Sequence, residues 1–334
     1  MESLDTMTTD SDLPRRISTG SLPRTSAVEA ALNGAHERFG SVTEGALSPV
    51  YPALGRANPD HFGLALVGAT GVSREAGDAQ VPFSLMSVAK PFAFAIACEH
   101  LGVATAAAYV GANATGLPFN SARAIEARPD GRTNPMVNPG AIATVSVIPG
   151  ESLEARWDLL LSSMSAFAGS PLELDLEMLE CARATNFQNR ALAMLLAARG
   201  AIHGDPADAV ELYTRQSSLS VTCLDLATMG ATLAHGGANP VTGRRVVGPE
   251  SARAALAAMA ISGLYETSGA WLMEIGLPGK SGIGGGIVTV SPGKGALGTF
   301  SPLLDGEGNS VRGILAARAI SRDLGLDIFA SSPQ

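Results

Sequence analysis

The pattern of apolar and polar positions changes along the chain from strand-like to helix-like and back. Short apolar or β-branched runs at 61–67 (HFGLALV) and 284–290 (GGGIVTV), together with 310–316, predict strands. The middle of the chain has apolar residues every three or four positions and much alanine, which predicts helices over 91–101, 153–168, 189–199, 222–235 and 249–259. We therefore expect an α+β fold in which early and late strands join in one sheet, with a helical insertion between them.

Composition supports a globular chain and narrows its partners. The 334 residues can bury at least one large core, and 46% hydrophobic with 16% charged residues is not the mixture of a disordered protein. The net charge of -8 provides no basic surface for nucleic acid or for an anionic membrane. We expect a small-molecule partner and no nucleic acid.

Targeting and redox signals indicate a cytoplasmic protein. Residues 1–25 are rich in Ser, Thr and Asp and have no apolar core of a signal peptide, so we expect a disordered tail. The charge-free stretch 101–119 contains glycines and a proline and is unsuited to crossing a membrane. Cys98, Cys181 and Cys223 are widely spaced, which suits a reducing compartment better than a disulfide scaffold.

Ser87 and Lys90 are the first candidates for chemistry. They are the ends of an SVAK segment at the start of an apolar helical run. Positions i and i+3 of a helix share a face, so the hydroxyl and the amine can meet. Burial disfavours the ammonium form, so a lysine in a dry pocket can accept a proton from a serine nucleophile. The same spacing occurs by chance in many helices, and alone it does not establish a catalytic pair.

A late glycine-rich segment adds weight to the serine and lysine. Lys280-Ser281-Gly282 is followed by Ile283 and three glycines, where backbone N–H groups at a strand edge could face a developing oxyanion. An ordinary turn before a strand is the alternative. Serine-lysine enzymes of the penicillin-binding and β-lactamase class, however, pair SxxK with a late K-[ST]-G in this order. The two segments together favour a serine nucleophile.

Cofactor and metal motifs are missing from the sequence. The glycines of 282–286 follow the lysine and do not open a helix, so they fit neither a P-loop nor a dinucleotide fingerprint. The five histidines show no HExxH and no paired spacing. We expect neither a cofactor nor a metal.

Further segments of the chain form a recognisable series. They are FSLMSVAK (83–90), FNS (119–121), NPMVNPGAI (134–142), NRALA (189–193), LAHGGANPVTG (233–243), GLPGKSGIGGG (276–286) and GNSVRG (308–313). In colinear order from about Gly45 to Ile320, this text resembles the serine-dependent glutaminases. The resemblance implies a β-lactamase-like fold, with an antiparallel sheet flanked by helices and a helical subdomain. It implies a catalytic domain over 26–334, with its sheet part at about 26–85 and 240–330 and its helical part at about 86–239.

The resemblance also implies roles for individual residues. It makes Ser87 the acyl-forming nucleophile, Lys90 its general base, and Tyr265 the group that passes a proton to the leaving ammonia. The main-chain N–H groups of Ser87 and Ile283 match the oxyanion hole. The residues that match groups holding the amino-acid end of glutamine are Tyr51, Asn138, Asn189, Tyr213 and, through its backbone, Ile283.

Two positions depart from the family pattern. Met86 stands before the nucleophile, where a polar Gln or Glu is usual, and Ala182 stands where the family has a Glu for the substrate's α-ammonium. Thr185 still matches the threonine three residues after that Glu. Glu180 could replace the missing carboxylate only if the local backbone shifted by two positions.

These observations predict a glutaminase-type amidohydrolase that converts L-glutamine to glutamate and ammonia through a Ser-Lys acyl-enzyme. One alternative is the same fold acting on an N-substituted glutamine or another amide, because Ala182 and Met86 remove polar groups. Others are a penicillin-recognising enzyme or esterase, and a non-catalytic binding descendant. The resemblance alone suggests a homodimer or homotetramer.

Overall fold

The centre of the fold is a five-stranded antiparallel sheet in the order β2-β1-β8-β7-β6. The structure is a computed structural model that describes residues 20–331. Residues 1–19 of the predicted disordered tail lie outside this described part. The early and late strands join in one sheet, as predicted. The strands are β1 (Gly63–Gly68), β2 (Ser73–Gly77), β6 (Gly279–Ser281), β7 (Gly286–Ser291) and β8 (Gly295–Phe300).

A second, three-stranded sheet connects segments of the helical part to the residues just before Ser87. Its order is β3-β5-β4, and both pairs are antiparallel. Its strands are β3 (Phe83–Ser84), β4 (Glu173–Leu174) and β5 (Leu219–Val221). Because β3 ends just before the SxxK segment, this sheet anchors the backbone that carries the candidate nucleophile.

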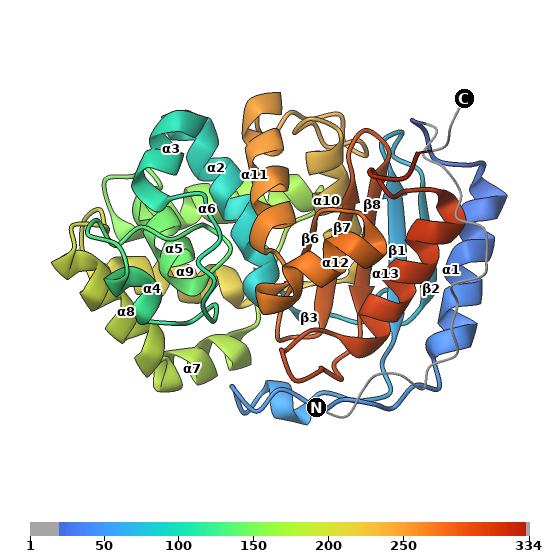
Figure 1. The fold of residues 1–334 in the computed structure, drawn as a ribbon, viewed down its shortest axis with the longest axis horizontal. Helices are drawn as coiled ribbons and strands as arrows, with labels where there is room; N and C mark the ends of the chain where they lie inside the picture. Colours follow the sequence, from blue (N-terminus) through green and yellow to red (C-terminus); the bar gives the residue numbers. More distant parts are fainter. Residues whose placement is uncertain (1–19, 332–334) are drawn as a thin grey trace.

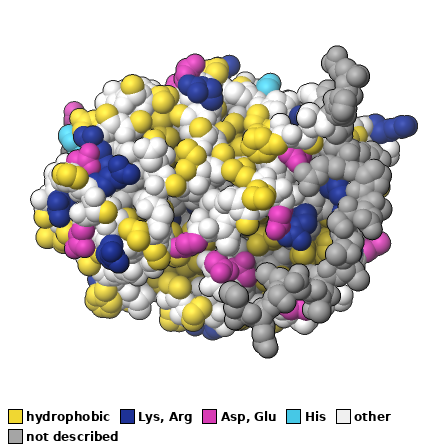
Figure 2. Space-filling model, viewed as in Figure 1, with side chains coloured by type: hydrophobic (Ala, Val, Ile, Leu, Met, Phe, Trp, Pro, Cys, Tyr) yellow, Lys and Arg dark blue, Asp and Glu magenta, His cyan; other side chains and the backbone are white. Residues whose placement is uncertain are grey.

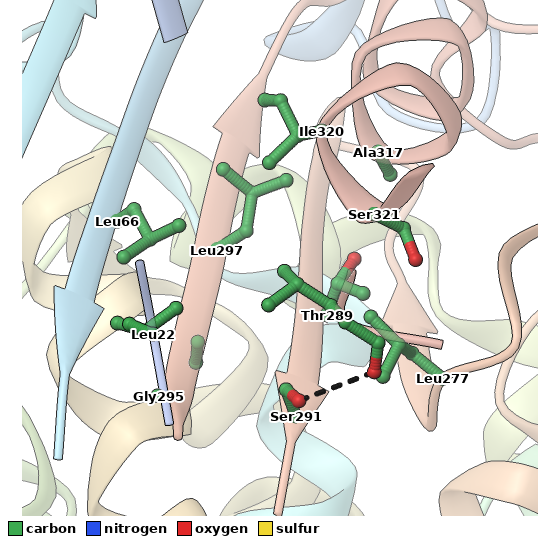
Figure 3. A pocket seen from close by; sticks show the side chains of 12 residues that line it. Leu22, Leu66, Leu277, Thr289, Ser291, Gly295, Leu297, Ala317, Ile320 and Ser321 are labelled. Carbon is green, nitrogen blue, oxygen red and sulfur yellow. Dashed lines mark hydrogen bonds between the residues drawn. The ribbon is translucent and has the colours of Figure 1, made fainter. Parts of the chain in front are cut away.

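Strand β1 shows why the apolar runs of the sheet are continuous rather than alternating. Leu64 and Leu66 are buried in the hydrophobic cluster on one side of the sheet, and Ala65 and Val67 are buried in the cluster on the other side. Helices cover both faces, so residues pointing either way avoid water. Figure 3 shows one such layer, where Leu66 of β1 and Leu297 of β8 face α13.

Helices cover both faces of the sheet and make up most of the left part of Figure 1. Helices α1 and α13 pack together on one face of the sheet, with α12 beside α13, and α10 covers the other face. The longer helices are α1 (Thr25–Phe39), α2 (Lys90–Leu101), α3 (Val103–Val110), α5 (Asn138–Ser146), α6 (Leu153–Ala168), α7 (Leu176–Thr185), α8 (Phe187–Ala198), α9 (Pro206–Ser217), α10 (Cys223–Ala234), α11 (Pro249–Ser262), α12 (Ser268–Ile275) and α13 (Val311–Leu324).

Short helical turns complete the chain. They are α4 (Arg123–Glu126) and the 3-10 helices η2 (Leu54–Arg56), η3 (Met86–Ala89) and η4 (Tyr265–Thr267). The five helices predicted from apolar spacing are confirmed, as parts of α2, α6, α8, α10 and α11. The predicted strands at 61–67 and 284–290 are confirmed as β1 and β7 within about two residues.

The predicted strand at 310–316 is wrong, because this segment begins helix α13. Ser310 caps the helix, and its side chain accepts a hydrogen bond from the backbone N–H of Gly313. The buried positions continue through Ala316, Ile320 and Leu324, which is helical spacing. A window that stops at Ala316 is too short to show that period.

Strand β8, in the middle of the sheet, has no strand-like sequence. It contains glycine where β-branched residues are usual, at Gly295 and Gly298. A Cβ at Gly298 would lie 2.8 Å from the backbone nitrogen of Ala227 on α10. The glycine therefore allows α10 to lie directly on the sheet, and tertiary packing rather than propensity makes this segment a strand.

The surface carries charges of both signs. On the face in Figure 2, Lys and Arg side chains lie among Asp and Glu side chains and neutral atoms. No helix within residues 20–331 combines the length and the apolar character needed to cross a membrane.

Candidate active site

The structure brings Ser87 and Lys90 into hydrogen-bond reach. Ser87 lies in η3 and Lys90 is the first residue of α2, so both belong to one continuous helical segment. Lys90 Nζ is 3.1 Å from Ser87 Oγ. The i, i+3 spacing thus places the amine beside the hydroxyl, as the sequence predicts.

Lys90 is buried and has neutral partners. Its side chain is 1% exposed, and its Nζ donates a 2.7 Å hydrogen bond to Asn138 Oδ1. The rings of Phe119 and Tyr213 lie 5.8 Å and 5.9 Å from Nζ. Burial lowers the pKa of Lys90 from 10.5 to about 7, because the ammonium form loses its hydration. A large fraction of this lysine is therefore neutral near pH 7 and can accept a proton.

A chain of amide hydrogen bonds runs from Lys90 into the helical part. Tyr213 OH, on α9, also donates to Asn138 Oδ1 at 3.1 Å. Asn138 Nδ2 donates to Asn189 Oδ1 at 3.0 Å, and Asn189 Nδ2 donates to Asn186 Oδ1 at 2.6 Å. The bonds fix the first residue of α5 against α8 and α9, so they orient the Asn138 amide that Lys90 contacts.

Tyr265 forms a hydrogen bond with the same serine. Burial raises the pKa of Tyr265 to about 12, and a hydrogen bond with Ser87 partly opposes this rise. The ring packs against Phe119, with centroids 4.4 Å apart. At neutral pH the phenol keeps its proton, so Tyr265 can donate a hydrogen bond or a proton.

Lys280 packs against the ring of Tyr265. Its Nζ lies 4.3 Å from the centre of the tyrosine ring and donates to the carbonyls of Gly263 at 2.8 Å and Ser281 at 2.6 Å. Burial and the positive charge of Lys90 hold the pKa of Lys280 well below its usual range. The late K-S-G motif therefore contributes a second buried lysine that contacts the tyrosine rather than the serine.

The glycine-rich turn after β6 lies against the nucleophile. A Cβ at Gly282 would lie 3.3 Å from the backbone nitrogen of Ser87, and one at Gly284 would lie 2.5 Å from the carbonyl of Ser84. Gly285 has a φ of +96°, which favours glycine. The turn can approach η3 this closely because these positions lack side chains, and it presents Ile283 to the cavity.

One cavity collects most of the predicted site residues. The lining is neutral, since the described residues that form it include no Asp, Glu, Lys, Arg or His. Tyr265 lines a neighbouring cavity, and Phe119 borders both. The residues predicted from the sequence that line the first cavity are Tyr51, Met86, Ser87, Asn138, Ala182, Thr185, Asn189, Tyr213 and Ile283.

Some contributors are not among the predicted site residues. Phe119 lies between the two cavities, and Asn186 orients Asn189. Asn186 is three residues before Asn189 at the start of α8, and that i, i+3 pair of amides was the available signal. Phe119 belongs to the FNS segment, but a short motif does not show where its ring points.

The two departures from the family pattern both face the cavity. Ala182 is 3% exposed, and α7 is regular from Leu176 to Thr185. Glu180 points outward, where its carboxylate forms a 2.8 Å ion pair with Arg183. The backbone shift that would bring Glu180 into the position of Ala182 is absent from this helix.

A metal site is not evident in residues 20–331. This part of the chain contains no group of three or more His, Cys, Asp or Glu side chains arranged to hold an ion.

Comparisons with known proteins agree with this site. The glutaminase family model matches residues 45–329. Glutaminase 2 of Yersinia pestis is 52% identical over 335 residues, covering 100% of this chain and 98% of its own. The solved structure titled probable glutaminase ybaS is 39% identical with a TM-score of 0.91, covering 92% of this chain and 100% of its own.

A third comparison concerns a structure solved with a small molecule. It is titled probable glutaminase from Bacillus subtilis complexed with 6-diazo-5-oxo-L-norleucine, and it is 26% identical with a TM-score of 0.81. The match covers 95% of this chain and 98% of that one. These structures confirm the predicted β-lactamase-like α+β fold.

Proposed function

The chain belongs to the glutaminase family, and on that premise we propose that it hydrolyses the side-chain amide of a glutamine-type substrate through an acyl-enzyme on Ser87. The observation that carries the mechanism is the 3.1 Å approach of Lys90 Nζ to Ser87 Oγ, with both residues buried. A neutral lysine there can remove the serine proton as the oxygen attacks the amide carbon. No cofactor enters this scheme.

The hydrogen bond to Asn138 orients the amine of Lys90. A neutral amine has two N–H groups and one lone pair, and one N–H donates to Asn138 Oδ1. This bond helps to hold the remaining groups of Nζ near Ser87. The lone pair can then accept the Ser87 proton, and the new C–O bond produces a tetrahedral intermediate.

The intermediate needs donors for its negative oxygen. We assign this role to the main-chain N–H groups of Ser87 and Ile283. The support is the lack of a side chain at Gly282, where a Cβ would lie 3.3 Å from the Ser87 nitrogen and narrow the approach to it. Backbone donors fixed in this way stabilise charge that develops in the transition state.

Tyr265 then serves the leaving group. Its pKa of about 12 keeps the phenol protonated at neutral pH, so it can donate a proton to the departing nitrogen. The C–N bond breaks, ammonia leaves, and the proton that Lys90 took from Ser87 replaces the one that Tyr265 gave. In the second half-reaction Lys90 takes a proton from water, the hydroxide attacks the ester, and Ser87 recovers its proton as the acid leaves.

The remaining predicted residues hold the other end of the substrate. Asn138, Asn189, Tyr213 and Tyr51 line one cavity with Ser87 and supply amide and hydroxyl groups to a polar ligand. Tyr213 is 5% exposed, and burial raises its pKa, so its hydroxyl remains a neutral donor. Such groups suit a carboxylate or a carbonyl better than a cation.

Other functions of the fold receive less support. A penicillin-recognising enzyme would share the serine and both lysines, but the family match and the named relatives are glutaminases. A fluorescent penicillin gives the direct comparison. We expect no covalent label on Ser87 with that compound.

Ammonia release tests the proposal. We expect Ser87→Ala to reduce it by several orders of magnitude, while Ser162→Ala, an exposed serine on α6, leaves it unchanged. Hydroxylamine added during turnover should be converted to a hydroxamate of the substrate acid, because it captures the acyl group from Ser87. Full activity in Ser87→Ala would refute the mechanism.

The homodimer or homotetramer and the cytoplasmic location remain predictions. Sedimentation velocity of the purified chain measures the first, and fractionation of cells that express it measures the second.

A further inference from the structure

One end of the cavity has an apolar lining that includes Tyr51, Met86 and Ala182. Met178 and Ala182 are four residues apart on α7 and share a buried face. Met178 packs with Met86 and Leu54 in a small hydrophobic cluster, and Tyr51 packs against that cluster. A ligand that enters this end of the cavity therefore meets methyl, thioether and aromatic groups.

The acidic side chains of α7 are engaged elsewhere. Asp175 caps the helix and accepts a 2.7 Å hydrogen bond from the hydroxyl of Ser84. Glu177 pairs with Arg56, and Glu180 pairs with Arg183. None of these carboxylates is among the residues that line the cavity.

An acid of α9 is paired as well. Glu211 accepts from Arg215 at 2.8 Å. It also pairs with Arg183, which joins α9 to α7. Moving Glu180 or Glu211 into the cavity would therefore break existing ion pairs.

Three amide oxygens of the cavity are already used as acceptors. Asn138 Oδ1 accepts from both Lys90 and Tyr213. Asn189 Oδ1 accepts from Asn138, and Asn186 Oδ1 accepts from Asn189. These oxygens have limited capacity for a further donor, and an ammonium is a donor with three N–H groups.

From these contacts we propose that the cavity prefers a γ-carboxamide whose α-nitrogen is uncharged, such as an N-acylated glutamine, over free glutamine. The inference rests on the proposed function, because it names the substrate of the same site. An ammonium in this neutral wall would lose hydration without gaining an anion. An acyl group removes that charge and adds apolar atoms that Ala182 and Met86, which line the cavity, can contact.

Three substrates test the preference at equal pH. They are L-glutamine, Nα-acetyl-L-glutamine and glutaramic acid, which is glutamine without its α-nitrogen. We expect kcat/KM of the wild type to be on the order of 10- to 100-fold lower for glutamine than for the other two, the range of one charged hydrogen bond. A wild type that hydrolyses glutamine at least as efficiently as both analogues overturns the inference.

The same assay separates the inference from the function on which it rests. Ammonia from glutamine in preference to the analogues, with loss in Ser87→Ala, contradicts only the inference. No ammonia from any of the three refutes both. Because the wild-type ranking decides the preference, the test does not depend on the folding of any variant.

A carboxylate placed in the wall tests its location. Ala182→Glu should raise kcat/KM for glutamine at least tenfold and lower it for the acetylated substrate. Ala184→Glu adds the same charge on an exposed position of the same helix and should change neither value. If a folded Ala182→Glu variant keeps the wild-type selectivity, the assignment to this wall is wrong.

Discussion

Replacing Lys90 with methionine should remove activity and yet make the fold less sensitive to pH. Methionine fills a similar volume without a charge, so the packing of α2 is largely retained. The ordinary pKa of lysine is 10.5, and burial lowers that of Lys90 to about 7. Between these values the unfolded chain holds a proton on this residue that the folded chain does not. The free energy of unfolding of the wild type therefore rises with pH across this window.

The size of the effect follows from the two pKa values. Keeping Lys90 neutral in the fold lowers the free energy of unfolding by about 4 kcal/mol at pH 7 and by about 2 kcal/mol at pH 9. Methionine also loses the hydrogen bonds of Nζ with Ser87 and Asn138, at about 1 kcal/mol each. We expect Lys90→Met to be more stable than the wild type by about 2 kcal/mol at pH 7 and about equally stable at pH 9.

Urea unfolding followed by the fluorescence of Trp157 and Trp271, both buried, measures this difference. The informative quantity is how much the stability difference between Lys90→Met and the wild type changes from pH 7 to pH 9. The lost hydrogen bonds contribute equally at both pH values and cancel in that comparison. Arg253→Met is the control, since that exposed cation is charged at both values. If the difference between Lys90→Met and the wild type is the same at both pH values, Lys90 is not neutral in the fold and the reasoning fails.

Three further outcomes can be checked directly. The kcat/KM of the wild type should fall about tenfold per pH unit below about pH 7, because a protonated Lys90 cannot accept a proton, and a flat profile from pH 5.5 to 8 would contradict this. Asn186→Ala should raise KM about tenfold through a misplaced Asn189 without moving that pH midpoint, and an unchanged KM would show that Asn186 does not position Asn189. Gly140→Ala should lower stability by about 1–3 kcal/mol, because its Cβ would overlap the carbonyl of Asn134, and an unchanged Tm would show that α5 can move.

The sequence predicts the parts of the site that depend on short spacing. Ser87 and Lys90 are three residues apart on one helical segment, so local geometry alone brings them together. The family resemblance predicts that distant residues such as Tyr51 and Tyr213 lie in one site. The structure places both at the same cavity. The joining of early and late strands followed from the order of apolar patterns.

The sequence does not predict features that arise from packing between distant segments. The role of Gly298 in β8 depends on α10, which begins some 75 residues earlier in the chain. The amide of Asn186 matters only because α8 lies beside α5 and α9. Neither residue type carries a local signal for its role, since glycine and asparagine are also common in turns.

Two residues of the site have strained backbone conformations that contacts with distant segments maintain. Among residues 20–331, the non-glycine residues with positive φ are Met86, at 49°, and Tyr265, at 55°. Such conformations cost on the order of 1–3 kcal/mol each and persist only when neighbours enforce them.

Those neighbours can be identified on both sides of the nucleophile. Met86 is held by the apolar cluster that includes Met178, and a Cβ on Gly284 would lie 3.3 Å from its Cγ. The backbone of Tyr265 is fixed by the hydroxyl of Ser268, which donates to its carbonyl at 2.8 Å. Met86 precedes the proposed nucleophile and Tyr265 is the proposed proton donor, so the packing of the rest of the molecule maintains a geometry at the site that local preference alone would relax. The strained turns and the buried lysine together mean that this site lowers the stability of the fold that positions it.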